Sequence, residues 1–284
     1  MMLQETYTLT NGVKVPKLGL GTWLIDKENA AQAVKEAINI GYRHIDTAQD
    51  YFNEAEVAAG IKACGVSREE IFLTTKLSAQ HKNYEDAVAA IDSSLQRMGL
   101  DYVDLMIIHS PQPWDKFGQS DRFTTGNQQA WQALEEAQNA GKIRAIGLSN
   151  FQQSDIDNIL KNGTIAPAVN QILAHVTNTP AALIQYAQEK GLLVEAYSPI
   201  GHGELFKNAQ LAQMAEKYEV TIPQLCIRYT LQLGLLPIPK TANPAHMKNN
   251  AEVDFVISPD DMAVLKGMEK IKDYGEASMF PVYQ

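Results

Sequence analysis

The chain has 284 residues, and 45% of them are apolar, which suffices for a buried core and suits one α/β barrel of about 250 residues. Its formal net charge of −9 argues against a nucleic-acid partner and against binding to anionic membranes. No segment approaches the ~18 apolar residues that span a bilayer, and two distant cysteines without Cys-x-x-Cys spacing predict free thiols and a cytoplasmic protein.

The first pattern along the chain is a β-hairpin. Residues 7–16 alternate on both sides of Asn11-Gly12, a dipeptide typical of two-residue hairpin turns. Because this hairpin precedes the repeating pattern, we expect it to cap the main fold.

Strand-like and helix-like segments then alternate to the end of the chain. Strands are predicted at residues 18–21, 43–46, 71–76, 103–109, 143–149, 168–171, 192–197 and 235–239. Helices are predicted at residues 29–39, 53–64, 84–98, 127–140, 154–161, 181–189, 211–218, 222–232, 245–250 and 259–268. Eight β–α units without an intervening linker predict a (β/α)8 TIM barrel that forms one domain over residues 1–284.

The alternative architecture is an open, doubly wound sheet. That fold binds dinucleotides at Gly-x-Gly-x-x-Gly after an early strand. Gly19 and Gly21 supply the first two glycines, but Leu24 occupies the third position. A dinucleotide is therefore not expected to bind this chain in the Rossmann manner.

Four polar residues stand at or just beyond the ends of successive predicted strands. Asp46, Lys76 and His109 each end an apolar segment, and Tyr51 follows Asp46 by five residues. Because the C-terminal ends of parallel barrel strands share one face, these side chains can meet in one pocket.

The chemistry of the four residues suits reduction of a carbonyl group. Tyr51 can donate a proton, Lys76 can lower the pKa of that tyrosine, and Asp46 can hold the lysine in place. His109 can donate a hydrogen bond to a carbonyl oxygen, while the hydride must come from a cofactor. Taken singly, each residue has an ordinary structural interpretation, such as a packed aromatic ring or a solvated charge. The histidines show no metal-binding spacing, and no metal is expected.

Longer motifs around these residues resemble the aldo-keto reductases along nearly the whole chain, in particular bacterial members of the 2,5-diketo-gluconate reductase type. The matching stretches are Leu18-Gly-Leu-Gly-Thr-Trp23, Gly41-Tyr-Arg-His-Ile-Asp-Thr-Ala48, Tyr51-Phe-Asn-Glu54, Thr74-Thr-Lys76, Gly147-Leu-Ser-Asn150, Pro167-Ala-Val-Asn-Gln171, Ala196-Tyr-Ser-Pro199 and Ile238-Pro-Lys240.

The resemblance implies a (β/α)8 barrel that reduces aldehydes and ketones with a nicotinamide cofactor, usually NADP(H). It assigns Tyr51 as general acid, Lys76 and Asp46 as the pair that tunes it, and His109 as the group that orients the carbonyl. The cofactor contacts that it implies are Thr22, Trp23, Asp46, Ser149, Asn150, Gln171, Tyr197, Ser198, Pro199, Ile200, Gly201, Lys240, Thr241, His246, Asn249 and Asn250. The implied substrate contacts are Trp23, Phe52, His109 and Ser110.

Two positions depart from the family pattern. His246 and Asn249 replace an arginine and a glutamate at the adenosine 2′-phosphate site, and a histidine binds phosphate less firmly than the fork of an arginine. We therefore expect NADP(H) with additional use of NAD(H). Ser110 replaces a tryptophan after the catalytic histidine, which predicts a wider or more polar pocket. Phe280 and Tyr283 could reach that pocket or pack on the surface.

The leading functional hypothesis is a monomeric reductase whose only partner is a small-molecule carbonyl substrate. The rival is a nicotinamide-binding regulatory or sensor subunit, which would have no reason to keep all four catalytic residues. A phosphate-sugar lyase or isomerase on the same barrel is disfavoured by the nicotinamide-site match.

Overall fold

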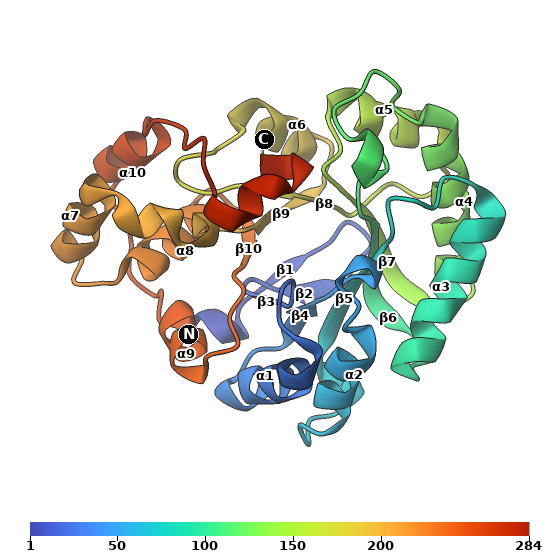
Figure 1. Ribbon diagram of the computed structural model, residues 1–284, viewed down its shortest axis with the longest axis horizontal. Coiled ribbons are helices and arrows are strands. Elements are labelled where there is room, and N and C mark those ends of the chain that lie inside the picture. Colours follow the sequence, from blue (N-terminus) through green and yellow to red (C-terminus); the bar gives the residue numbers. More distant parts are fainter. Residues whose placement is uncertain (284) are drawn as a thin grey trace.

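The predicted strands form one closed sheet in a computed structural model that describes residues 1–283 (Figure 1). The strand order is β10-β9-β8-β7-β6-β5-β4-β3, and each neighbouring pair is parallel. Hydrogen bonds of 3.1 Å from Gly19 N to Pro237 O and from Gly21 N to Pro239 O join the first strand to the last. The predicted (β/α)8 barrel is therefore confirmed.

The barrel strands are β3 (Leu20–Gly21), β4 (His44–Asp46), β5 (Phe72–Leu77), β6 (Val103–Ile108), β7 (Ile143–Ser149), β8 (Val169–Leu173), β9 (Leu193–Tyr197) and β10 (Leu236–Ile238). The helices are α1 (Lys27–Ile40), α2 (Glu54–Lys62), α3 (Tyr84–Met98), α4 (Thr124–Asn139), α5 (Gln153–Asn162), α6 (Ala181–Glu189), α7 (Ala209–Lys217), α8 (Ile222–Gln232), α9 (Pro244–Ala251) and α10 (Pro259–Lys266).

Each predicted helix and barrel strand occurs, and the ends differ by no more than three residues. Helices α3, α6 and α8 begin and end where the apolar spacing predicts. The largest shift is at α4, which begins at Thr124 rather than at residue 127. Helix ends are the least determined part of such patterns because terminal turns lack the full set of internal hydrogen bonds.

The N-terminal hairpin is present, but its turn is longer than predicted. Strands β1 (Thr6–Thr8) and β2 (Lys14–Pro16) pair in antiparallel fashion. A hydrogen bond of 2.8 Å from Leu9 N to Val13 O closes a loop of three residues, with Gly12 at a φ of 85°. Glycine suits this left-handed position, which a three-residue hairpin loop requires.

Glycines in β3 and directly before it allow the barrel to close. A Cβ atom at Gly21 would lie 2.9 Å from Ile238 O, and one at Gly19 would lie 2.7 Å from His44 Nδ1. Both distances are shorter than atoms tolerate, so a side chain at either position would push β3 away from its neighbours. Gly19 and Gly21, which supply only two of the three glycines of the Rossmann pattern, thus have a packing role in this fold.

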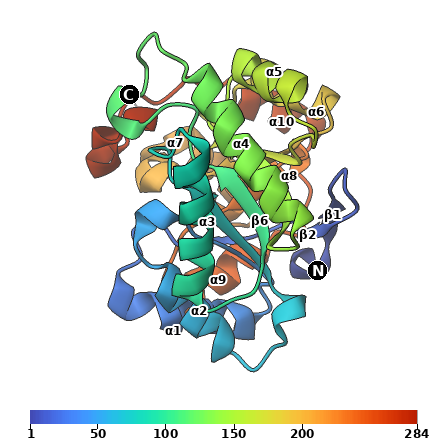
Figure 2. The same ribbon diagram turned by 90° about the vertical axis from the view of Figure 1, so that its right-hand side faces the viewer.

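The two halves of the barrel interior differ in character. The half nearest the N-terminal hairpin is apolar, where Leu9 and Val15 pack against Phe72, Leu105 and Leu236. The half at the C-terminal ends of the strands holds buried polar side chains: Asp46, Lys76, Ser149, Gln171 and Glu195. The chain termini lie at opposite ends of the barrel (Figure 2), and the C-terminal segment lies at the polar end.

Both cysteines are free thiols, with Cys226 buried and Cys64 partly buried. In the described residues 1–283, no helix combines the length and apolar character needed to cross a membrane.

Candidate functional site

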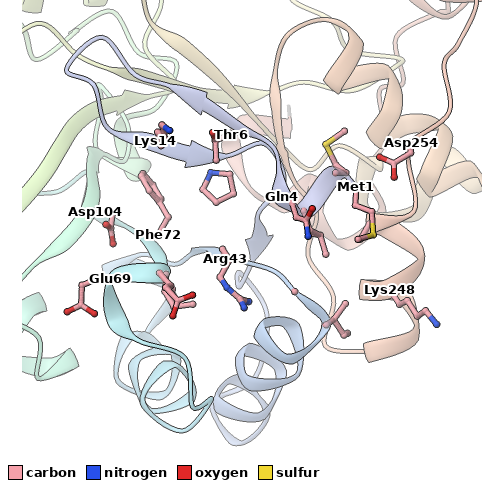
Figure 3. A pocket seen from close by; sticks show the side chains of 18 of the residues that line it. Met1, Gln4, Thr6, Lys14, Arg43, Glu69, Phe72, Asp104, Lys248 and Asp254 are labelled. Atoms are coloured by element: carbon pink, nitrogen blue, oxygen red, sulfur yellow. The ribbon is translucent and has the colours of Figure 1, made fainter.

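Two cavities of similar size lie at the two ends of the barrel. The cavity at the C-terminal ends of the strands measures about 640 Å³, and the one beside the N-terminal hairpin about 650 Å³. Figure 3 shows the second cavity, where Lys14, Glu69, Lys248 and Asp254 are exposed to solvent. The predicted catalytic residues lie at the other end, so that end is the candidate active site.

Lys76 and Asp46 form a buried ion pair beneath the first cavity. Nζ of Lys76 lies 2.5 Å from Oδ1 of Asp46 and 3.0 Å from the carbonyl oxygen of Thr47. Both side chains are almost fully shielded from solvent. The ammonium group lies 4.7 Å from the centroid of the Tyr51 ring. The arrangement places a fixed positive charge under the predicted acid.

Residues after Tyr51 hold its loop against the barrel. The Asn53 side chain accepts a hydrogen bond of 2.8 Å from Thr47 Oγ1 and donates one of 3.0 Å to Thr22 O. The Glu54 carboxylate accepts a bond of 2.6 Å from Thr75 Oγ1 and pairs with Arg97 at 2.6 Å. The Asn-Glu pair after Tyr51 therefore has a structural task, which is to fix the loop that presents the tyrosine.

The pKa of Tyr51 is raised, although Lys76 was expected to lower it. Burial raises the pKa of Tyr51 well above its usual range, and the negative charges of Asp46 and Asp50 add to this effect. Lys76 does not offset these effects, and its ammonium group is already paired with the Asp46 carboxylate at 2.5 Å. Tyr51 therefore holds its proton at neutral pH, which is the state that a proton donor needs.

His109 directly follows β6 and packs against two aromatic rings. Its ring centroid is 5.6 Å from that of Tyr51 and 5.0 Å from that of Trp114, both in edge-to-face geometry. Nδ1 of His109 lies 3.2 Å from Oδ2 of Asp50. Burial lowers the pKa of His109 below its usual range, so the imidazole is largely neutral near pH 7.

Side chains predicted to hold a nicotinamide converge on the same cavity. The Asn150 side chain donates to Ser149 Oγ at 3.0 Å and accepts from Tyr197 Oη at 2.8 Å. Gln171 Nε2 donates to Asp46 Oδ2 at 2.9 Å and to Glu195 Oε2 at 2.7 Å. All these residues except Glu195 line the cavity. The set offers the hydroxyl and carboxamide groups that an amide ligand requires.

Glu195 is a buried acid that the sequence patterns did not single out. Burial raises the pKa of Glu195 to about 8, and the charge of Asp46 acts in the same direction. Its Oε1 atom has no hydrogen-bond partner among the described residues. The sequence contains one indication of this residue, because a carboxyl group is unusual inside an apolar strand such as Leu193–Tyr197. Glu195 is thus held in its neutral form beneath the ion pair.

The remaining predicted contacts divide into two groups. The predicted residues that line the cavity are Trp23, Asp46, Tyr51, Phe52, His109, Ser149, Asn150, Gln171, Tyr197, Ser198, Pro199, Ile200 and Lys240. Those that do not line it are Thr22, Lys76, Ser110, Gly201, Thr241, His246, Asn249 and Asn250.

Several residues outside the cavity have other contacts. Thr22 Oγ1 donates to Asp46 O at 2.9 Å, which ties the end of β3 to that of β4. Asn249 donates to Thr221 Oγ1 at 2.9 Å, and Asn250 is buried in α9. His246 and Lys240 are exposed, and Lys240 lies at the cavity rim. An exposed cation at the rim suits a phosphate group that extends out of the cavity.

The structure corrects the prediction for Ser110. This residue is fully buried, its hydroxyl accepts a hydrogen bond of 3.2 Å from Gln112 N, and it does not line the cavity. Trp114, four residues later, lines the cavity beside His109 instead. The indole missing at position 110 is therefore supplied from position 114, so serine does not leave the pocket without an aromatic wall.

The C-terminal segment covers part of the cavity. The Tyr283 ring stacks at 6.2 Å from Trp23, and Phe280 packs edge-on against Trp23 at 4.7 Å. Oη of Tyr283 lies 2.8 Å from Ser198 Oγ and 2.8 Å from His202 Nε2. The sequence left open whether Phe280 and Tyr283 reach the pocket or pack on the surface. In the structure both residues line the pocket.

Unusual backbone conformations gather around this cavity. Four non-glycine residues that line it have positive φ angles: Phe52 (57°), Asn150 (62°), Ser198 (50°) and His202 (55°). Such conformations cost energy in residues with a Cβ and cluster at sites where surrounding contacts impose them. This clustering is independent support for a functional site at this end of the barrel.

In the described part of the chain, no three His, Cys, Asp or Glu side chains are grouped so that they could hold a metal ion.

Comparisons with known proteins agree with this geometry. A model of the Aldo/keto reductase family matches residues 17–270. Glyoxal reductase of Bacillus subtilis is 40% identical over 275 residues, covering 96% of both chains. Aldehyde reductase YPR1 of Saccharomyces cerevisiae is 36% identical over 309 residues, covering 98% of this chain and 97% of that protein.

Solved structures give the same result. An aldo/keto reductase from Brucella melitensis superimposes with a TM-score of 0.87 at 35% identity, covering 94% of this chain and 98% of that one. A Bombyx mori aldo-keto reductase in complex with NADP gives a TM-score of 0.86 at 33% identity, covering 98% of both chains. The chain therefore belongs to the aldo/keto reductase family, whose members reduce carbonyl groups with a nicotinamide cofactor.

Proposed function

We propose that this protein reduces small aldehydes and ketones to alcohols with NADPH, with Tyr51 as the proton donor. The observation that carries the proposal is the buried Lys76–Asp46 ion pair directly beneath a protonated tyrosine that lines the cavity. A fixed cation at this position has a clear use if negative charge develops on Tyr51 during the reaction.

The cavity residues fit a nicotinamide ring. Both hydrogen bonds of the Gln171 side chain are donated by Nε2, and no described residue donates a hydrogen bond to its Oε1. This oxygen is therefore free to accept from the carboxamide NH2, while Ser149 and Asn150 can serve the carbonyl side. Tyr197 offers a flat face for stacking, and Lys240 offers a charge for phosphate.

The bound cofactor supplies a hydride to the carbonyl carbon. The negative charge that forms on the carbonyl oxygen takes the proton from Tyr51 Oη. Lys76, whose ammonium group lies 4.7 Å from the centroid of the Tyr51 ring, then stabilises the phenolate, and Asp46 prevents the lysine from moving toward solvent. His109 and Trp114 line the space in which the carbonyl oxygen would lie.

Small aldehydes are the proposed substrate class. Relatives over nearly the full chain are named glyoxal reductase and aldehyde reductase. The aromatic cavity walls from Trp23, Trp114 and Phe280 suit compact or partly apolar substrates. The absence of an arginine at His246 and of a glutamate at Asn249 supports additional use of NADH. We further propose a cytoplasmic monomer in which residues 1–284 form one domain.

The test is steady-state oxidation of NADPH and of NADH with a panel of aldehydes and ketones, for the native protein and for Tyr51→Phe. Turnover with a loss of at least about 100-fold in the variant, and with cofactor binding retained, is the expected result. Cofactor binding by the native protein without turnover of any carbonyl would favour the sensor or regulatory role instead. Equal turnover by the variant would remove Tyr51 from the mechanism.

A further inference from the structure

Asp50 contacts two active-site residues that lie in a distant part of the chain. Its Oδ2 atom accepts a hydrogen bond of 3.0 Å from Trp114 Nε1 and lies 3.2 Å from His109 Nδ1. Asp50 belongs to the short 3₁₀ turn Gln49–Tyr51, and Trp114 begins another one, Trp114–Lys116. The Asp50 side chain is only 27% exposed and lines the cavity.

The contact determines which nitrogen of His109 carries hydrogen. Although burial opposes it, hydrogen bonding with His109 lowers the pKa of Asp50, so the group is a carboxylate near neutral pH. A carboxylate can only accept hydrogen bonds, so His109 Nδ1 must be the donor in this pair. In a neutral imidazole the other nitrogen, Nε2, then has a lone pair and no hydrogen.

We propose that Asp50 is a positioning residue that keeps hydrogen on His109 Nδ1, so that His109 can donate to a substrate carbonyl oxygen only as an imidazolium. This inference rests on the proposed carbonyl reduction. It changes the expected role of His109, because a neutral ring in this tautomer accepts a hydrogen bond and therefore suits the hydroxyl group of an alcohol.

The charges that face His109 act in opposite directions. Burial and the positive charge of Lys76 disfavour the imidazolium, whereas Asp50 and Asp46 favour it. Tyr51, the other titratable group against the ring, is protonated and neutral. The imidazolium therefore becomes populated only as the pH falls below neutral. Carbonyl reduction should accordingly strengthen toward about pH 6, and alcohol oxidation should strengthen toward roughly pH 8.

The substitution Asp50→Leu tests the tautomer directly, because it removes every polar partner of His109 Nδ1 at similar volume. Without that acceptor the ring hydrogen can move to Nε2, where a neutral His109 can donate to a carbonyl. Asp50→Asn is the second variant. Because the same oxygen, Oδ2, faces both Trp114 Nε1 and His109 Nδ1, a carboxamide oxygen in its place keeps both contacts and hence the hydrogen on Nδ1.

Activity is measured as kcat/KM in both directions between about pH 5.5 and 9. In the native protein we expect carbonyl reduction to fall about tenfold from roughly pH 6 to 8. In Asp50→Leu that part of the profile should be flat within about twofold, whereas Asp50→Asn should retain a rise on the acid side. Asp115→Asn removes an exposed carboxylate next to Trp114 and is the matched control, with an unchanged profile expected.

Nitrogen-15 NMR of labelled histidine gives a readout that does not depend on turnover. The native protein and Asp50→Asn should show hydrogen on Nδ1 of His109, assigned by loss of the signal in His109→Gln, and Asp50→Leu should show it on Nε2. Hydrogen on Nε2 in the native protein, or an acid-side rise that persists in Asp50→Leu, would overturn the proposal. Failure of the carbonyl panel with the expected NMR result would instead count against the proposed function alone.

Discussion

The two ends of the barrel hold cavities of nearly equal volume, yet only one has the features of a reaction site. At the hairpin end most charged side chains are exposed, as for Lys14 and Glu69, and the buried Asp104 pairs with Arg144, whose side chain is 44% exposed. At the other end, Lys76, Asp46 and Glu195 are all buried together. Volume therefore does not distinguish the two cavities, whereas the burial of several charges together does, because desolvation changes how strongly each group holds a proton.

The same contrast explains where the chain is strained. Positive φ angles at Phe52, Asn150 and Ser198 surround the cavity with the buried charges. At the other cavity, the lining residue Phe72 packs in an apolar cluster with Leu9 and Val15 and so contributes to the stability of the barrel. Substitutions at the two ends should therefore affect different measurements.

The largest effect is expected at the catalytic end, for Lys76→Met. Loss of the ammonium group leaves the Asp46 carboxylate buried without its partner and removes the charge that stabilises a Tyr51 phenolate. We expect kcat to fall by about 1,000-fold. Steady-state kinetics check this result, with thermal unfolding to verify that the variant folds. Lys62→Met, at an exposed lysine that does not line the cavity, should keep its kcat.

A pH effect on stability comes next, at Glu195. Its pKa is about 8 in the folded protein, against a usual value of 4.5. Between these values the folded protein binds a proton that the unfolded chain lacks, so the free energy of unfolding falls as the pH rises. Glu195→Gln should remove this loss and be more stable than the native protein at about pH 7, by about 3 kcal/mol. Urea unfolding at several pH values measures the difference, and parallel curves for the two proteins would contradict it.

The smallest of the three effects is expected near the hairpin end, for Asp104→Asn. This buried carboxylate pairs with Arg68 at 2.8 Å and with Arg144 at 2.6 Å. The variant should lose about 2 kcal/mol of unfolding free energy, less than for a fully buried pair because Arg144 is partly exposed. Its kcat should stay within about twofold of the native value. A large loss of kcat in a folded variant would mean that the two ends are coupled.

The local patterns of the sequence were sufficient for the element order. Apolar spacing at 84–98, 181–189 and 222–232 predicted α3, α6 and α8 with their observed ends, because each has an amphipathic face. The hairpin loop was predicted one residue too short, since Asn11-Gly12 also fits a three-residue loop. The four strand-end residues were found because their polar character is unusual there.

By itself, the sequence determined the barrel, the family motifs and the residues that can carry the reaction, because periodicity and residue chemistry are local properties. Only the tertiary structure decided the contacts between distant segments. Trp114 took the place expected for an aromatic residue at 110, Asp50 met His109, and Glu195 lay beneath Gln171. It also reversed the expected direction for Tyr51, because a pKa depends on burial and on surrounding charges that no linear pattern records.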